Sequence, residues 1–122
     1  MYHCHVRFYL AGLSQPLAEE IKAMPPLDRF THSFVQSEGL EAELAAAADV
    51  IIAAAENPAA VERLSGGGEL ILLAEQADWA SFSGVLERVE DFWPRSMSCE
   101  ELRFRFRRWQ ERCRQRWDAW ET

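Results

Sequence analysis

The sequence lacks the features that would place the chain in a membrane or among disulfide-linked proteins. No apolar run approaches the ~20 residues that span a bilayer, and no charged N-terminal region precedes a signal-type apolar core. The three cysteines, Cys4, Cys99 and Cys113, are widely spaced and form no paired motif, which favours reduced thiols. We therefore expect a cytoplasmic protein that makes no contact with a membrane.

Positive charge is scarce over most of the chain. Residues 1–101 carry 6 Lys and Arg against 17 Asp and Glu, a net of −11, whereas residues 102–122 carry 7 Arg against 3 acidic residues, a net of +4. The acidic body disfavours direct nucleic-acid binding, and the Arg residues of the last segment alternate with aromatic residues that should be buried. With 122 residues and an apolar share of 48%, the chain is expected to form a single domain, residues 1–122.

Short apolar runs alternate with amphipathic stretches along the chain. This alternation predicts a parallel sheet with helices on both faces, joined by right-handed crossovers. In the helix expected at 78–89, the spacing places Phe82, Val85, Leu86 and Val89 on the inner face. Strands are expected at 3–10, 30–36, 49–54, 69–74 and 90–93, and helices at 14–24, 38–47, 58–64, 78–89 and 98–121.

The run from Ala48 to Pro58 is typical of a strand that is buried on both faces and followed by a helix beginning at Asn57-Pro58. In α/β folds, ligands and reacting groups lie at the carboxyl ends of such strands. Here that end offers Ala53, Ala54 and Ala55, which carry no nucleophile, acid or base. The place where a site is expected is chemically empty.

Three local patterns could indicate a ligand, and none has the context that the ligand requires. Ser65-Gly66-Gly67-Gly68 has no Gly-Lys-Ser/Thr ending and follows a helix, whereas a phosphate loop follows a strand. His3-Cys4-His5 lacks a second ligand cluster at zinc-finger spacing. Ala11-Gly12-Leu13-Ser14-Gln15 is a poor cradle for a flavin phosphate. We therefore expect no metal, no cofactor and no enzymatic activity.

Several landmarks resemble the receiver domain of two-component response regulators, over nearly the whole chain. Receivers have an Asp at the end of the third strand and a Pro four residues later, and the matching positions here are Ala54 and Pro58. The stretch Asp91-Phe92-Trp93-Pro94-Arg95-Ser96-Met97-Ser98-Cys99-Glu100-Glu101-Leu102 is similar to the family's aromatic residue, Lys-Pro-Phe and Ser/Pro-Glu-Glu-Leu. Gly39-Leu40-Glu41-Ala42 looks like the start of the family's second helix.

The resemblance implies a three-layer α/β/α, doubly wound (βα)5 fold with the flavodoxin-like strand order 2-1-3-4-5 and an extended C-terminal helix. In a receiver, the Asp accepts a phosphoryl group from a histidine kinase, two acids after the first strand hold Mg²⁺, and a hydroxyl and a Lys bind the phosphoryl oxygens. Only a positive charge is retained, at Arg95, which we expect to pair with Glu56 or Glu75. The positions corresponding to the acids, the phosphoacceptor, the hydroxyl and the Lys are Leu10 and Ala11, Ala54, Ala74 and Arg95.

Large apolar residues of the last helix step by three or four residues and form one narrow stripe. Its first turns should pack on the sheet, but the stripe continues past the usual end of a receiver's last helix, and Phe104 lies on the opposite face. We expect a homodimer through this helix, or a stalk leading to a protein partner or fused output domain (a histidine kinase, diguanylate cyclase or transcription factor). The expected interface residues are Phe104, Phe106, Trp109, Cys113, Trp117 and Trp120.

Two functions remain open from the sequence. The first is a signalling domain of a two-component or phosphorelay-type regulator that works without phosphorylation, as a regulatory and dimerisation module. The alternative is a sensor of a small ligand or protein partner that uses the vacated crevice lined by Leu10, Ala11, Ala54 and Ala74.

Overall fold

The computed structural model describes residues 4–27, 29–55, 58–64 and 68–121, with side chains described between residues 5 and 115 of these ranges. None of the described helices is long and apolar enough to cross a membrane. In chain order, the elements are β1 (Cys4–Ala11), α1 (Gln15–Ala23), β2 (Phe30–Ser37), α2 (Ala42–Ala46), β3 (Val50–Ala54), α3 (Pro58–Glu62), β4 (Glu69–Leu73), η1 (Gln76–Arg88), β5 (Asp91–Trp93) and α4 (Cys99–Glu121).

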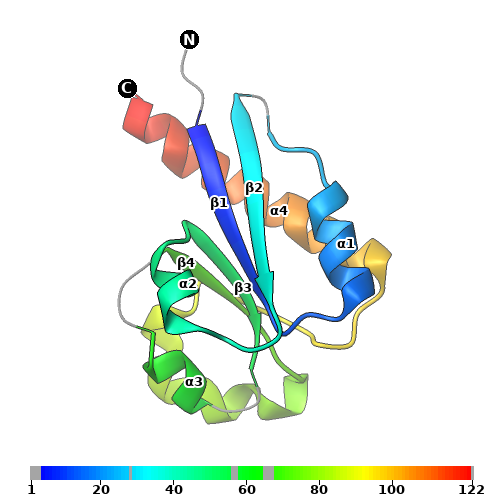
Figure 1. The fold of residues 1–122 in the computed structure, drawn as a ribbon, viewed down its shortest axis with the longest axis vertical. Helices are drawn as coiled ribbons and strands as arrows, with labels where there is room; N and C mark the ends of the chain where they lie inside the picture. Colours follow the sequence, from blue (N-terminus) through cyan, green and yellow to red (C-terminus); the bar gives the residue numbers. More distant parts are fainter. Residues whose placement is uncertain (1–3, 28, 56–57, 65–67, 122) are drawn as a thin grey trace.

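Five parallel strands form one sheet in the order β2-β1-β3-β4-β5, which confirms the predicted architecture. The apolar run Val50–Ala54 occupies the centre of this sheet as β3, and its first four residues are buried. Figure 1 shows α1 and α4 on one side of the sheet, with α2 and α3 on the other. Each face of the sheet therefore has its own core.

The core under α1 and α4 contains the large aromatic side chains. Phe8 of β1 lies beside Phe106 and Trp109 of α4, with ring centroids 5.8 and 5.7 Å apart, and Ile21 of α1 is fully buried nearby. The core under α2, α3 and η1 is built from smaller residues and is closed by Phe82 of η1. Burial of these apolar side chains is the main force that fixes both helical layers on the sheet.

The sheet is covered less completely than predicted, because α2 is only five residues long. The hydroxyl of Tyr9 accepts a hydrogen bond from the Glu41 backbone N–H and donates one to the Gly39 carbonyl, which holds the preceding loop in an extended path. The first halves of β1 and β2 consequently present a polar face to solvent. This face carries His5, Arg7, Thr31, Ser33 and Val35, all exposed.

The element at 76–88 is a 3₁₀ helix and not the regular α-helix that the apolar spacing suggested. The backbone at Val85 leaves helical geometry, with φ −123° and ψ 16°. Phe82 and Val85 are buried as predicted, but the side chain of Leu86 is 54% exposed, so its inward placement was wrong. Three residues per turn, with this break, rotate position 86 away from the sheet.

Asp49 directly precedes β3 and joins the middle of β1 to the start of β4, where its carbonyl accepts a hydrogen bond from the Glu69 backbone N–H at 3.0 Å. The Asp49 carboxylate accepts hydrogen bonds from the Arg7 guanidinium at 3.1 and 3.2 Å and from the Arg7 backbone N–H at 2.9 Å. Burial raises the pKa of Asp49, but these bonds and the charge of Arg7 outweigh it and hold that pKa below its usual value. Gly68 passes so close that a Cβ there would lie 1.7 Å from the Asp49 carbonyl oxygen.

The last helix begins directly after Ser98, close to the start predicted from the sequence. The Ser98 hydroxyl accepts a hydrogen bond from the Glu101 backbone N–H at 3.1 Å, and so satisfies one of the unpaired donors of the first turn. The Glu101 carboxylate pairs with Arg105, one turn further along the helix, at 2.9 Å. The described backbone of α4 continues as far as Glu121.

Candidate functional site

The carboxyl edge of the sheet brings together the positions that the sequence identified as a vacated site. Leu10 and Ala11 end β1 beside β3, with Ala11 opposite Ala53, and Ala54 is the last residue of β3. Ala74 follows β4 directly, and its backbone N–H donates to the Trp93 carbonyl at 3.1 Å. Leu10, Ala11 and Ala74 are at most 1% exposed, and Ala54 is partly buried. These side chains offer alkyl groups and no ligand atom.

The loop after β1 lies directly against the end of β3. Gly12 has φ +71°, and its backbone N–H donates to the Ser37 carbonyl at 3.0 Å. A Cβ at Gly12 would lie 3.4 Å from the Ala54 carbonyl oxygen and 3.6 Å from the Ala54 Cβ. A side chain at position 12 would therefore contact the end of β3 at Ala54, the position where the resemblance implies a phosphoacceptor.

Polar groups reach this edge from the loops that follow β4 and β5. The Ser96 hydroxyl donates to the Glu75 carboxylate at 2.9 Å, and the exposed Arg95 lies next to Ser96 in the chain. Glu56, one of the two predicted partners of Arg95, lies outside the described residues. The expected pairing of Arg95 with Glu56 or Glu75 therefore stays a prediction.

Three of the six residues of the expected partner interface on α4 lie inside the molecule. Phe106, Trp109 and Cys113 are at most 1% exposed, so their assignment to a partner surface was wrong. They pack on the sheet, and the Trp109 indole N–H and the Cys113 thiol both donate to the Glu69 carboxylate at 3.3 Å. The stripe is the inner face of α4 over these turns.

Phe104, in contrast, is 66% exposed and remains available to a partner. It is one of the large apolar side chains that the described residues leave at the surface, with Val35 and Leu86. The side chains of Trp117 and Trp120 lie outside the described residues, although the α4 backbone passes through both positions.

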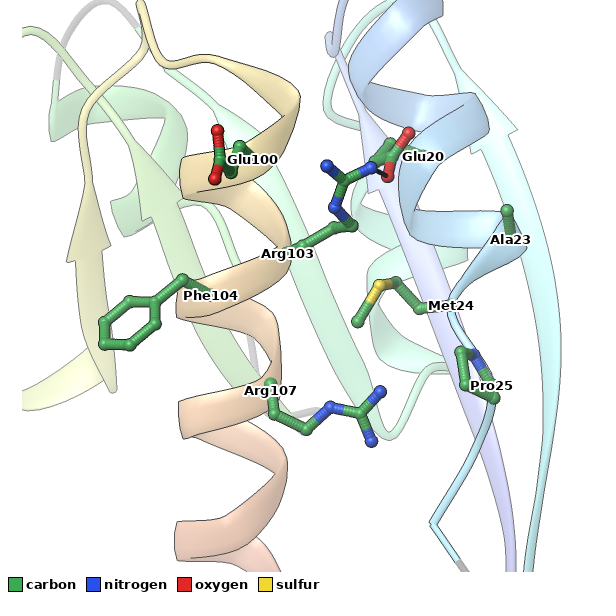
Figure 2. Close-up of a pocket in the computed structure, with 8 residues that line it drawn as sticks. All are labelled: Glu20, Ala23, Met24, Pro25, Glu100, Arg103, Phe104 and Arg107. Atoms are coloured by element: carbon green, nitrogen blue, oxygen red, sulfur yellow. Dashed lines mark hydrogen bonds and ion pairs between the residues drawn. The ribbon is translucent and has the colours of Figure 1, made fainter.

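A shallow groove of about 610 Å³ runs between the end of α1 and the first turns of α4. Figure 2 shows Arg103 reaching across it to Glu20, and the Nη1–Oε1 distance of this ion pair is 2.6 Å. Phe104 points away from α1 in the same view. No local sequence signal predicts this groove, because its two walls are some 80 residues apart. It is lined by Glu20, Ala23, Met24, Pro25, Glu100, Arg103, Phe104 and Arg107.

Two histidines lie on opposite faces of the first strands. The exposed His5 ring is hydrogen-bonded to the Thr31 and Ser33 hydroxyls at 2.6 and 3.0 Å, while His3 of the His-Cys-His pattern lies outside the described residues. His32 is half-buried against Phe8, with ring centroids 4.8 Å apart, and its buried Nδ1 has no hydrogen-bond partner among the described residues. Burial, helped by the nearby His5, lowers the pKa of His32 to about 4.

No family model matches the chain, and no curated protein matches its sequence. Among solved structures, the chain is similar to one described as a CpaE2 pilus assembly protein from Sinorhizobium meliloti 1021. The TM-score is 0.60 at 14% identity, over 84% of this chain and 98% of that chain. The chain has a flavodoxin-like α/β fold. At this identity the likeness shows the fold, and it leaves the receiver family as a resemblance carried by the sequence.

Proposed function

We propose that the chain is a receiver-like regulatory domain that does not accept phosphoryl groups and works by association through α4. The observation that carries this proposal is the alkyl lining of the carboxyl edge. Leu10, Ala11 and Ala54 stand where the resemblance implies two metal-binding acids and a nucleophile.

Phosphoryl transfer to a protein side chain needs a nucleophilic atom and, in receivers, a divalent cation to neutralise the transferring group. Mg²⁺ takes oxygen ligands at 2.0–2.1 Å in octahedral geometry. The side chains of Leu10, Ala11 and Ala54 supply no oxygen. What the fold retains, on this proposal, is a surface that partners recognise.

Incubation with acetyl phosphate and Mg²⁺, followed by intact-protein mass spectrometry, tests the loss of phosphotransfer. We expect no phosphoryl adduct on the wild-type chain, while an active receiver treated in parallel gains one. The variant Ala54→Asp should also remain unmodified, because a carboxylate alone does not replace the metal site. Stoichiometric phosphorylation of the wild type would overturn the proposal.

The alternative use of the crevice, as a pocket for a small ligand, predicts a different result. A compound that occupies it should raise the thermal midpoint, since a ligand that binds only the folded state stabilises that state. Ala74→Gly tests this use of the crevice, because it removes a methyl group from the lining at the end of β4. The variant should weaken binding of such a ligand without changing association through α4.

The similar solved structure favours a second setting for the same regulatory role. That protein is described as a pilus assembly protein, and nearly all of its solved chain superposes on this one. A receiver-like module within an assembly protein would need partner recognition and no phosphotransfer. Affinity capture with the wild-type chain and with Phe104→Ser would identify partners that depend on the α4 surface. Loss of assembly-protein partners only in Phe104→Ser would support this setting.

A further inference from the structure

The solvent-facing side of α4 carries charges that lack partners within the described chain. Arg103 pairs with Glu20, Arg105 with Glu101 and Arg112 with Asp91. Glu100 and Arg107, in contrast, make no ion pair or hydrogen bond with any other described residue. They are both exposed and lie one turn before and one turn after the exposed Phe104, and Figure 2 shows the Arg107 side chain extending toward Pro25.

These three residues share one face of the helix, opposite the buried stripe. At 100° per residue, Glu100 and Arg107 are separated by two turns and differ by only about 20° around the axis, with Phe104 between them. Along the axis they lie about 10 Å apart, at 1.5 Å per residue. Figure 2 shows Glu100, Phe104 and Arg107 on successive turns of α4, with the Phe104 ring directed away from α1.

This short pattern of acid, aromatic ring and base is complementary to a second copy of itself that is rotated by 180°. Rotation by 180° about an axis perpendicular to α4, placed between Arg103 and Phe104, exchanges positions 100 and 107. Glu100 of each helix then faces Arg107 of the other, and the two Phe104 rings meet near the axis. Two Glu100–Arg107 pairs then form, one on each side of the axis, and both exposed rings are covered.

We propose that two copies of this chain associate through an antiparallel α4–α4 contact centred between Arg103 and Phe104, with reciprocal ion pairs between Glu100 and Arg107. The inference rests on the proposed association through α4 and specifies its geometry. The occupant is a second copy because the pattern matches itself.

Arg108 is also exposed and makes no ion pair or hydrogen bond with another described residue, but it lies about 80° around the axis from Glu100, against about 20° for Arg107. Three further arrangements are disfavoured by charge. Parallel helices would place Glu100 beside Glu100 and Arg107 beside Arg107 of the second copy. An antiparallel contact centred one turn later, on Arg107 itself, would oppose the two Arg107 side chains. A centre between Arg105 and Phe106 would oppose Glu100 and Glu111. Like charges in contact destabilise a pairing by about as much as opposite charges stabilise it.

A charge-swap cycle tests this register by sedimentation equilibrium at low salt. Glu100→Arg and Arg107→Glu each replace two attractions by two repulsions, and each should weaken the dimer roughly 30-fold if an exposed pair contributes ~0.5 kcal/mol. The double variant Glu100→Arg/Arg107→Glu should restore most of the affinity, because the pairs re-form with their signs exchanged. Arg63→Glu makes the same change of charge beside α3, on the other side of the sheet, and should have no effect.

Circular dichroism and thermal unfolding of each variant show whether it is folded. Glu100→Arg places a positive charge at the helix N-terminus and slightly destabilises the helix, and this effect persists in the double variant. Association of the wild type should also weaken at about 0.5 M NaCl, where the pairs are screened. A dimer that tolerates both single variants, or a double variant that remains as weak as the singles, refutes this register and leaves association through α4 standing. A wild type that is monomeric at about 1 mM overturns the proposed association as well.

Discussion

The free energy of unfolding of this protein should begin to fall at pH values well above those at which carboxylates are protonated, because of His32. Its ring lies in the aromatic cluster beside Phe8, Phe34 and Phe106, where a charged imidazolium is poorly solvated. The lowering of its pKa from 6.5 to about 4, caused first by burial and then by the charge of His5, means that the folded protein holds His32 neutral at pH 7. The unfolded chain, in contrast, takes up a proton near pH 6.5.

The sign and size of the effect follow from this difference. Between pH 6.5 and about 4 the unfolded state binds more protons, so the free energy of unfolding falls as the pH falls and levels off below about pH 4. A fully shielded ring would lose about 3.4 kcal/mol over this window, at 1.36 kcal/mol for each pKa unit. Because His32 is only half-buried, solvent screening reduces the expected loss to ~1.5 kcal/mol.

Urea denaturation at several pH values between about 7.5 and 4 measures this loss. His32→Phe keeps an aromatic ring in the cluster and removes the titrating group, so its stability should be nearly independent of pH down to about 4.5. His5→Gln is the matched control on the exposed face, and should retain most of the decline. The reasoning fails if His32→Phe shows the full wild-type decline, or if the His32 ring titrates near pH 6.5 in an NMR titration.

Two further outcomes test the packing. Trp109→Ala should lose about 3–5 kcal/mol in urea denaturation, because the ring is 1% exposed and its removal leaves a cavity, whereas Phe104→Ala on the same helix should change the free energy of unfolding by less than about 0.5 kcal/mol. Equal losses for the two would contradict the assignment of the inner and outer faces of α4. Gly68→Ala should lower the thermal midpoint by several degrees, since a Cβ at 1.7 Å from the Asp49 carbonyl oxygen forces the backbone to move, while Gly39→Ala, which meets nothing within 4 Å, should not.

The strand order was predictable because two independent signals agreed. The alternation of β-branched runs with amphipathic stretches gave the parallel sheet, and the receiver resemblance supplied the order. The geometry of η1 was not predictable by the same means. Apolar spacing placed Phe82, Val85 and Leu86 on one face, but the pattern does not report that the backbone tightens to 3₁₀ geometry and breaks at Val85.

The carboxyl edge and the α4 surface also differ in how far the sequence predicted them. The empty carboxyl edge could be read from Leu10, Ala11 and Ala54, because strand ends lie at known places in a parallel sheet. On α4, the spacing of apolar residues predicted the stripe but not the surface that it covers, since a sheet of the same chain and a second subunit both select apolar residues. The ion pair of Glu20 with Arg103 joins residues that only the folded chain brings together.

The short α2 has a consequence for how the molecule opens. Parallel strands are normally shielded on both sides, but the first halves of β1 and β2 meet water on one side, and β2 is also the edge of the sheet. Peeling β2 away exposes less apolar area than separating β3 from β4, so its amide protons should exchange through partial opening, while those of the central pair wait for global unfolding. Because His32 of β2 also packs on Phe106 of α4, with ring centroids 6.4 Å apart, release of β2 would uncover part of the inner face of α4 and loosen the helix through which association is proposed.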